Sequence, residues 1–110
     1  MKTKEEWIDA AHAALATGDL AAAEAANRAA LELDPQDAEL WHALAMTAYK
    51  QGNYPAAIEA GRRAAQIEPN DGMVWTGLSL AYMKNDQIPE AEAAGAKAKV
   101  ISWGGKVQFE

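Results

Sequence analysis

The sequence predicts an all-α fold, an α-solenoid of three consecutive helix hairpins with about six helices. Three tryptophans recur at equal intervals, and alanine and aliphatic positions keep the same interval. A period of about 34 residues is typical of arrays in which each repeat is one helix–turn–helix unit. Alanine, the best helix former, supplies 27 of the 110 residues. The repeating positions are Trp7, Trp41 and Trp75; Ala23, Ala57 and Ala91; Ala30, Ala64 and Ala98; and Leu33, Ile67 and Ile101.

The repeat keeps its register without an insertion, so the chain divides into equal units. One domain at 4–105 contains the units 4–37, 38–71 and 72–105, and a tail follows at 106–110. Each unit should hold two helices separated by a short turn. The first helices are expected at about 4–17, 38–51 and 72–84, and the second helices at about 21–33, 55–67 and 89–101.

The starts of the three first helices are marked by residues that can accept hydrogen bonds from unpaired backbone N–H groups. Thr3 followed by Glu6 is a capping box, in which each side chain accepts from the other residue's N–H. Asp37 and Asp71 precede the other two first helices, and aspartate is a preferred capping residue there. These signals agree with the boundaries that the repeat predicts.

Glycine and proline mark the turns within the units. Gly18 and Gly52 are expected to turn the chain between paired helices, and Asp86 takes that place in the third unit. Pro55 and Pro89 fall in the first turn of second helices, where the N–H that proline lacks has no intrahelical partner. The same hairpin design is therefore expected in all three units.

The junctions between units indicate where the array ends. Pro35 and Pro69 stop second helices and begin the next unit, whereas Trp103 stands where a third proline would fall. This replacement predicts that the array stops after three units. Repeat arrays need a cap with a polar outer face. Trp103, Val107 and Phe109 could fold back over the last hairpin, or the open end could pair with another copy.

The composition excludes several classes of protein. The absence of cysteine excludes disulfides and thiolate metal sites. A net charge of −6 without a basic stripe argues against nucleic-acid binding, because phosphate contacts need clustered Lys and Arg. No stretch reaches the roughly 18 apolar residues of a membrane helix, and no apolar segment follows the charged start as in a signal peptide. We therefore expect a cytoplasmic protein that contacts neither nucleic acid nor membrane.

The first helices carry two stripes of side chains. In the first unit Trp7, Ala10, Ala11 and Ala14 share one face, which should pack against the paired helix. A second stripe lies roughly 140° away and mixes apolar with polar residues. Stacking the three first helices would align these second stripes into one surface. Because contiguous exposed apolar area usually marks a binding site, this surface is the predicted site.

Large and small residues recur at matching positions of the three units. They are Trp41, Leu44, Gly52, Tyr54, Ala57, Ala64 and Pro69 in the second unit, Trp75, Leu78, Tyr82, Ala91 and Ala98 in the third, and Trp7, Gly18, Ala23, Ala30 and Pro35 in the first. This pattern resembles the tetratricopeptide repeat (TPR) family over nearly the whole chain. The resemblance implies a right-handed superhelix whose first helices line a concave groove for a peptide or helix of another protein.

Two departures from the family pattern are informative. One known family mode grips a partner's C-terminal carboxylate with Lys, Arg and Asn side chains. The matching positions here hold Ile8 and His12, then Ala43, then Met73 and Gly77, so no cation is available and a carboxylate clamp is excluded.

The second departure lies in the second helices. Asn27, Gly61 and Gly95 occupy a position where the family often has a large aromatic residue. Glycine in the middle of a helix costs about 1 kcal/mol relative to alanine. Two glycines at one register therefore suggest a close approach between helix backbones.

The predicted function is a non-enzymatic protein-interaction module without metal or cofactor. Its partner would be a protein or peptide segment that is at least partly apolar. The residues expected to contact it are Ile8, His12, Glu39, His42, Met46, Tyr49, Met73, Thr76, Leu80, Met83 and Lys84.

Two alternatives remain open. The protein could be a self-associating scaffold that forms homo-oligomers through the C-terminal end, with acidic Glu5, Glu6 and Asp9 meeting basic Lys97, Lys99 and Lys106. The other alternative is a metal-dependent or catalytic protein that uses His12 and His42, the two histidines of the chain.

Overall fold

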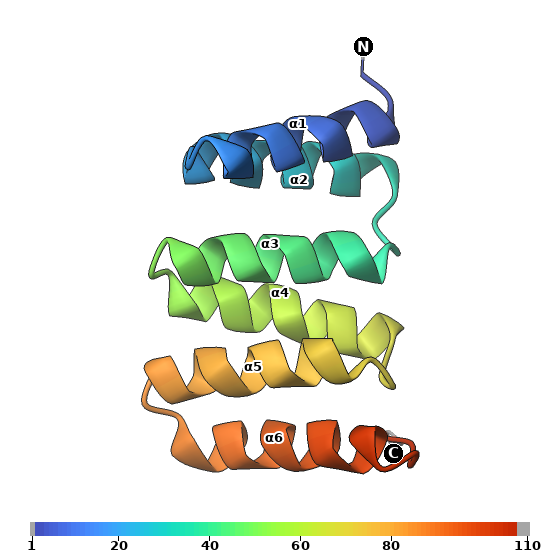
Figure 1. The fold of residues 1–110 in the computed structure, drawn as a ribbon, viewed down its shortest axis with the longest axis vertical. Helices are drawn as coiled ribbons and strands as arrows, with labels where there is room; N and C mark the ends of the chain where they lie inside the picture. The colour runs from blue at the N-terminus through green and yellow to red at the C-terminus, as the bar shows by residue number, and fades with distance from the viewer. Residues whose placement is uncertain (1, 108–110) are drawn as a thin grey trace.

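The computed structural model describes residues 2–107, which form six α-helices and no strand. Figure 1 shows them stacked in chain order along the long axis of the molecule. The helices are α1 (Lys4–Ala16), α2 (Leu20–Leu33), α3 (Ala38–Lys50), α4 (Tyr54–Ile67), α5 (Gly72–Lys84) and α6 (Ile88–Ser102). The predicted all-α solenoid is confirmed. None of these helices is long and apolar enough to cross a membrane.

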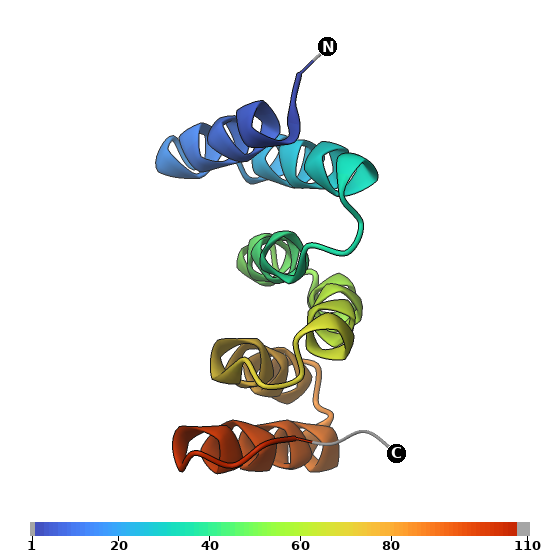
Figure 2. The same ribbon diagram turned by 90° about the vertical axis from the view of Figure 1, so that its right-hand side faces the viewer.

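The helices pack as three hairpins, α1 with α2, α3 with α4 and α5 with α6. Adjacent hairpins meet through α2 against α3 and α4 against α5, and α3 also touches α5. In Figure 2 the first helices α1, α3 and α5 lie toward the left, and α2 and α4 lie toward the right. The result is a stack of 40 × 25 × 21 Å in which each unit touches mainly its neighbours.

The predicted caps hold the starts of the first helices. Thr3 and Glu6 form the capping box, with each side chain accepting from the other residue's backbone N–H. The Asp37 carboxylate accepts from two N–H groups at the start of α3. The Asp71 carboxylate accepts from the Met73 N–H at the start of α5, at 3.0 Å. These bonds satisfy donors that have no partner within the helix.

The turns inside the hairpins need a left-handed backbone. Gly18 and Gly52 have φ values of +79° and +78°, and Asp86, their counterpart, has +60°. Asp tolerates this conformation better than most side chains do. Directly after the two glycines, Asp19 and Asn53 cap α2 and α4 through their side-chain oxygens.

The tryptophan and proline repeats prove to be one feature. The Trp41 indole N–H donates to the Pro35 carbonyl at 2.8 Å, and the Trp75 indole N–H donates to the Pro69 carbonyl at 2.7 Å. Each bond joins the first helix of one unit to the loop that ends the preceding unit. The bond explains why each tryptophan follows its proline by the same six residues.

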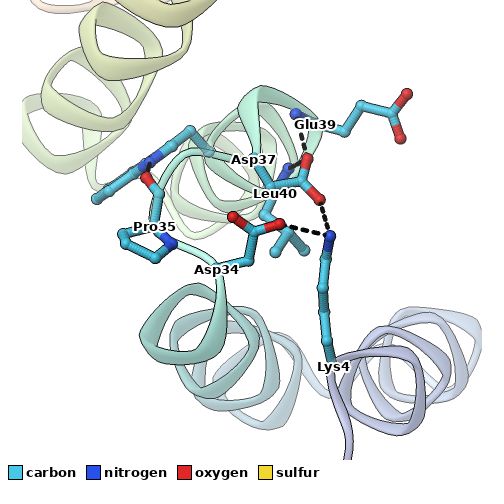
Figure 3. Close-up of polar contacts among 7 residues, drawn as sticks. Lys4, Asp34, Pro35, Asp37, Glu39 and Leu40 are labelled. Carbon is cyan, nitrogen blue, oxygen red and sulfur yellow. Dashed lines mark hydrogen bonds and ion pairs between the residues drawn. The ribbon is translucent and has the colours of Figure 1, made fainter.

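An ion-pair cluster fastens the first hairpin to the second. The Lys4 ammonium lies 2.8 Å from the Asp34 carboxylate and 2.7 Å from the Asp37 carboxylate, as Figure 3 shows. Hydrogen bonds to these two carboxylates raise the pKa of Lys4, and the bond from Lys4 lowers the pKa of Asp34. The cluster joins α1 to the loop between α2 and α3.

Small residues allow the helices of neighbouring units to approach closely. A Cβ atom at Gly61 would lie 2.9 Å from Leu78 Cδ2 of α5, so this glycine makes room for a side chain of the next unit, whereas the prediction was a close approach between backbones. At Gly95 a Cβ would meet only the Ser79 hydroxyl, at 3.4 Å. The third residue at this register, Asn27, is buried, and its side-chain NH₂ has no hydrogen-bond partner within residues 2–107.

The C-terminal segment turns back after α6. Gly104 has a φ of +85°, and the Gly105 N–H donates to the Val100 carbonyl at 2.9 Å, which closes a Schellman-type end. Val107 is buried against the core, and its N–H donates to the Asn70 side chain at 2.8 Å. Trp103 does not cover the last hairpin, because it is 78% exposed. Phe109, also expected there, lies outside the described residues.

Candidate functional site

An open hollow of about 510 Å³ lies over α5, between α3 and the C-terminal end of α6. Most of the side chains around it are apolar, and none is a lysine or arginine. Its lining residues are His42, Met46, Asp71, Gly72, Met73, Thr76, Gly77, Leu80, Ala98, Ile101 and Ser102.

The floor of the hollow is one face of α5. Met73, Thr76, Gly77 and Leu80 follow the spacing that places residues on the same side of a helix. Met73 is 71% exposed and Leu80 is 45% exposed, so both offer apolar surface to a ligand. The Thr76 hydroxyl donates to the Gly72 carbonyl at 2.9 Å and is thus already engaged in the helix.

The wall from α3 depends on a glycine of α5. His42 and Met46 are one helical turn apart and both are half-buried. A Cβ at Gly77 would lie 2.8 Å from Met46 Cε and 3.6 Å from His42 Cε1. Gly77 therefore leaves the space in which these side chains lie against the backbone of α5, and the two helices together close one side of the hollow.

The opposite wall comes from the last turns of α6. Ala98, Ile101 and Ser102 line it, and the Ile101 side chain reaches within 3.6 Å of a Cβ position at Gly72. Sequence reasoning missed these three residues because it assigned the site to first helices alone. For Ala98 a signal was available in its position, because it lies in the last unit of the array. Its counterpart in the second unit, Ala64, is fully buried, whereas Ala98 is half-buried.

Five of the predicted contact residues line the hollow, namely His42, Met46, Met73, Thr76 and Leu80. Ile8 is instead half-buried against the core cluster around α2 and α3. Tyr49 packs its ring edge-on against Tyr54, with 5.5 Å between ring centroids. Met83 is 54% exposed and borders a separate hollow between α5 and α6.

The remaining predicted residues, His12, Glu39 and Lys84, are exposed side chains of α1, α3 and α5 outside this lining. The second stripes of the first helices thus do not form one continuous hollow in the described part of the chain. The hollow includes the part of the predicted surface that α3 and α5 supply. It also includes residues of α6, which the prediction left out.

The polar groups of the hollow are few. Asp71 is its acidic residue, and its carboxylate is already an acceptor for the Met73 N–H. His42 of α3 adds an imidazole to the lining. Within residues 2–107, no three His, Cys, Asp or Glu side chains lie together in a way that could hold a metal ion. This arrangement is suited to contact with an apolar group and not to binding an anion.

Comparisons with known proteins agree with this architecture. Two family models described as tetratricopeptide repeat match the chain, one over residues 8–72 and the other over residues 48–98. A comparison with curated proteins found no match.

Solved structures of the same fold match nearly the whole chain. A crystal structure of MamA is 22% identical with a TM-score of 0.89, covering 93% of this chain and 60% of MamA. The second TPR domain of Spaghetti (RPAP3), bound to the HSP90 peptide SRMEEVD, is 15% identical with a TM-score of 0.86, covering 91% and 93%. YrrB, described as a TPR protein with an unusual peptide-binding site, is 16% identical with a TM-score of 0.86, covering 92% and 52%. The chain thus spans 60% of the MamA chain, and these likenesses show the fold.

Proposed function

Because the chain belongs to the tetratricopeptide repeat family, we propose that it is a non-enzymatic module that binds a partly apolar segment of a partner protein. The observation that carries this proposal is the hollow over α5, where Met73 and Leu80 stay exposed within an apolar lining. Burying apolar surface is favourable by about 25 cal/mol per Å². A partner segment that places apolar side chains there would therefore gain binding energy from the contact.

The absence of cations in this lining favours an internal segment over a C-terminal one. A free carboxylate is recognised by Arg, Lys or a cluster of N–H donors. The hollow instead holds one acidic residue, Asp71, and one histidine, His42. The HSP90 peptide bound by the Spaghetti domain contains three acidic residues in seven. We expect such a peptide to bind poorly to this chain.

Flexible side chains suit a segment whose sequence varies. Met46 in the wall from α3 is half-buried, and Met73 in the floor from α5 is exposed. Methionine has an unbranched, polarizable side chain that can adapt to different apolar neighbours. The predicted contacts His12, Glu39 and Lys84 lie outside the hollow, and we propose that they orient the flanking parts of a bound segment.

A peptide library tests the proposal even though the partner is unidentified. A phage-displayed library of random linear peptides is selected on immobilised wild-type protein. We expect enrichment of peptides with one or more large apolar residues, independent of a free C-terminus. A synthetic peptide from the enriched set then gives the dissociation constant by titration calorimetry, and SRMEEVD serves as the acidic comparison peptide.

Two substitutions on α5 distinguish specific binding in the hollow from non-specific binding to exposed apolar side chains. Met73→Glu places a carboxylate in the hollow, whereas Met83→Glu changes an exposed methionine outside it. We expect Met73→Glu to weaken peptide binding at least tenfold and Met83→Glu to leave it unchanged, both with wild-type helix content. No enrichment on the wild type, or equal binding by both variants, would contradict the proposal.

A further inference from the structure

The C-terminal end of the array presents a second apolar surface, separate from the peptide site. A hollow of about 410 Å³ opens between α5 and α6. Two large side chains at its edge, Met83 and Ile88, are 54% and 45% exposed. Its lining residues are Ser79, Met83, Ile88, Ala91, Glu92, Gly95, Ala96 and Lys99, which we call the end surface.

The repeat shows what such a surface accommodates. Gly61, one period before Gly95, is buried and holds the Leu78 side chain of α5 against it. At this position of the second unit, α4 is therefore covered by α5, the first helix of the next unit. Gly95 has the same place in the third unit, but within residues 2–107 its nearest side-chain neighbour is Ser79 of its own hairpin. The turn at Gly104 carries the chain toward Asn70, and none of residues 103–107 lines the end surface.

The N-terminal helix is a poor occupant for this surface. In α5, Val74 and Leu78 fill the junction with α4. The equivalent positions of α1 are occupied by Glu6 and Ala10. Glu6 is also engaged in the capping box. A head-to-tail stack of copies would thus bring a short side chain and a carboxylate to Gly95, where the internal junction uses large apolar ones.

Charge complementarity indicates a different arrangement of two copies. Glu92 and Lys99 are exposed on α6, border the end surface, and form no ion pair within the described part of the chain. The midpoint between them falls at Gly95 and Ala96. If two α6 helices cross in opposite directions at that midpoint, Glu92 of each copy faces Lys99 of the other.

We propose that two copies of this chain associate through their end surfaces about a two-fold axis near Gly95 and Ala96. Such an interface is self-complementary, as two-fold interfaces must be. Gly95 and Ala96 carry little side-chain bulk where the helices cross, so the backbones can come close. Met83 and Ile88 then lose their exposure to water against the partner copy.

The interface should be weak and depend on concentration, because contact through little more than one helix from each copy lies at the low end of interface sizes. Sedimentation equilibrium of the full chain over a wide range of concentrations measures it. We expect a monomer–dimer equilibrium without larger species, since a two-fold contact uses up the surface on both copies.

Charge reversal tests the pairing. Glu92→Lys and Lys99→Glu each place like charges opposite one another at two symmetric positions, so each should weaken the dimer about tenfold. The double variant E92K/K99E restores both pairs and should return the affinity to near the wild-type value. All these side chains are exposed, and circular dichroism at low concentration confirms that each variant is folded.

A head-to-tail arrangement gives other results. There, Glu92→Lys would strengthen association with acidic α1, Lys99→Glu and Asp9→Lys would each weaken it, and oligomers would exceed a dimer. Strengthening by Glu92→Lys, weakening by Asp9→Lys, oligomers larger than a dimer, or a strict monomer at millimolar concentration overturns the two-fold dimer.

The test is independent of peptide binding. We expect Met83→Glu to weaken the dimer and Met73→Glu to leave it intact, which is the reverse of their effects at the peptide site. Failure of one proposal therefore leaves the other measurable.

Discussion

Replacing Gly95 with alanine should stabilise the array, whereas replacing Gly61 with alanine should leave its stability unchanged or lower it. Both residues lie inside second helices, at the same position of adjacent units. In each, alanine gains about 1 kcal/mol of helix propensity over glycine. The gain in helix propensity is thus the same for both substitutions. The two sites differ in the atoms that the new methyl group would contact.

At Gly61 the new Cβ would lie 2.9 Å from Leu78 Cδ2 and 3.0 Å from Leu78 Cγ. Leu78 is buried in the core, so it can move only by displacing its neighbours. Overpacking of this kind costs about 1–3 kcal/mol, which makes Gly61→Ala neutral to about 2 kcal/mol destabilising. At Gly95 the nearest atom is the Ser79 hydroxyl at 3.4 Å, so Gly95→Ala should be about 1 kcal/mol stabilising.

Urea denaturation followed by circular dichroism, at low micromolar concentration, gives both free energies of unfolding. The variants should differ by about 1–3 kcal/mol, or about 4 °C or more in melting temperature. Equal stabilisation by both substitutions would refute the reasoning. It would mean that Leu78 moves aside freely and that the distance between α4 and α5 is not fixed by the glycine.

Two further predictions concern the first junction. Lys4→Met should lower the melting temperature at neutral pH, and the loss should shrink in high salt, because exposed ion pairs are screened. The pKa of Asp34 in the folded state lies below its ordinary 3.8, because its carboxylate accepts a hydrogen bond from Lys4. Its contribution to stability is therefore present above about pH 4 and is lost as the pH falls through the lowered pKa. The melting temperatures of wild type and Lys4→Met should converge as the pH falls, and a constant difference would contradict the ion-pair account. Asp37→Ala should cost about 1 kcal/mol for the lost cap and more than Asp71→Ala, because Asp37 accepts from two backbone N–H groups and pairs with Lys4, whereas Asp71 accepts from one N–H. Equal losses in thermal denaturation would contradict this account.

The fold was largely predictable because its signals are local. The spacing of the tryptophans set the register, and Thr3, Asp37 and Asp71 marked helix starts that the structure confirms within a residue or two. What the sequence did not reveal was why tryptophan and proline repeat together. Their hydrogen bond links residues six apart through a loop, and no helical periodicity predicts it.

The candidate site was predictable where it depends on helix periodicity. Met73 and Leu80 share a face of α5 because of their spacing, and the structure places both in the hollow. Ile101 was missed because the prediction assigned the site to the first helices alone, whereas the hollow also includes the last turns of α6. Tyr49 follows the same stripe, yet its contact is with Tyr54 across the hairpin turn, which depends on how two rings pack and not on the helical repeat.

The bonds from Trp41 to Pro35 and from Trp75 to Pro69 cross from each unit to the one before it. The acceptor lies at the end of one unit and the donor near the start of the next, and the second unit carries one of each, Trp41 and Pro69. Duplicating the second unit would therefore regenerate the junction without changes elsewhere. A chain built this way can alter its length by gene duplication while every internal boundary stays chemically complete.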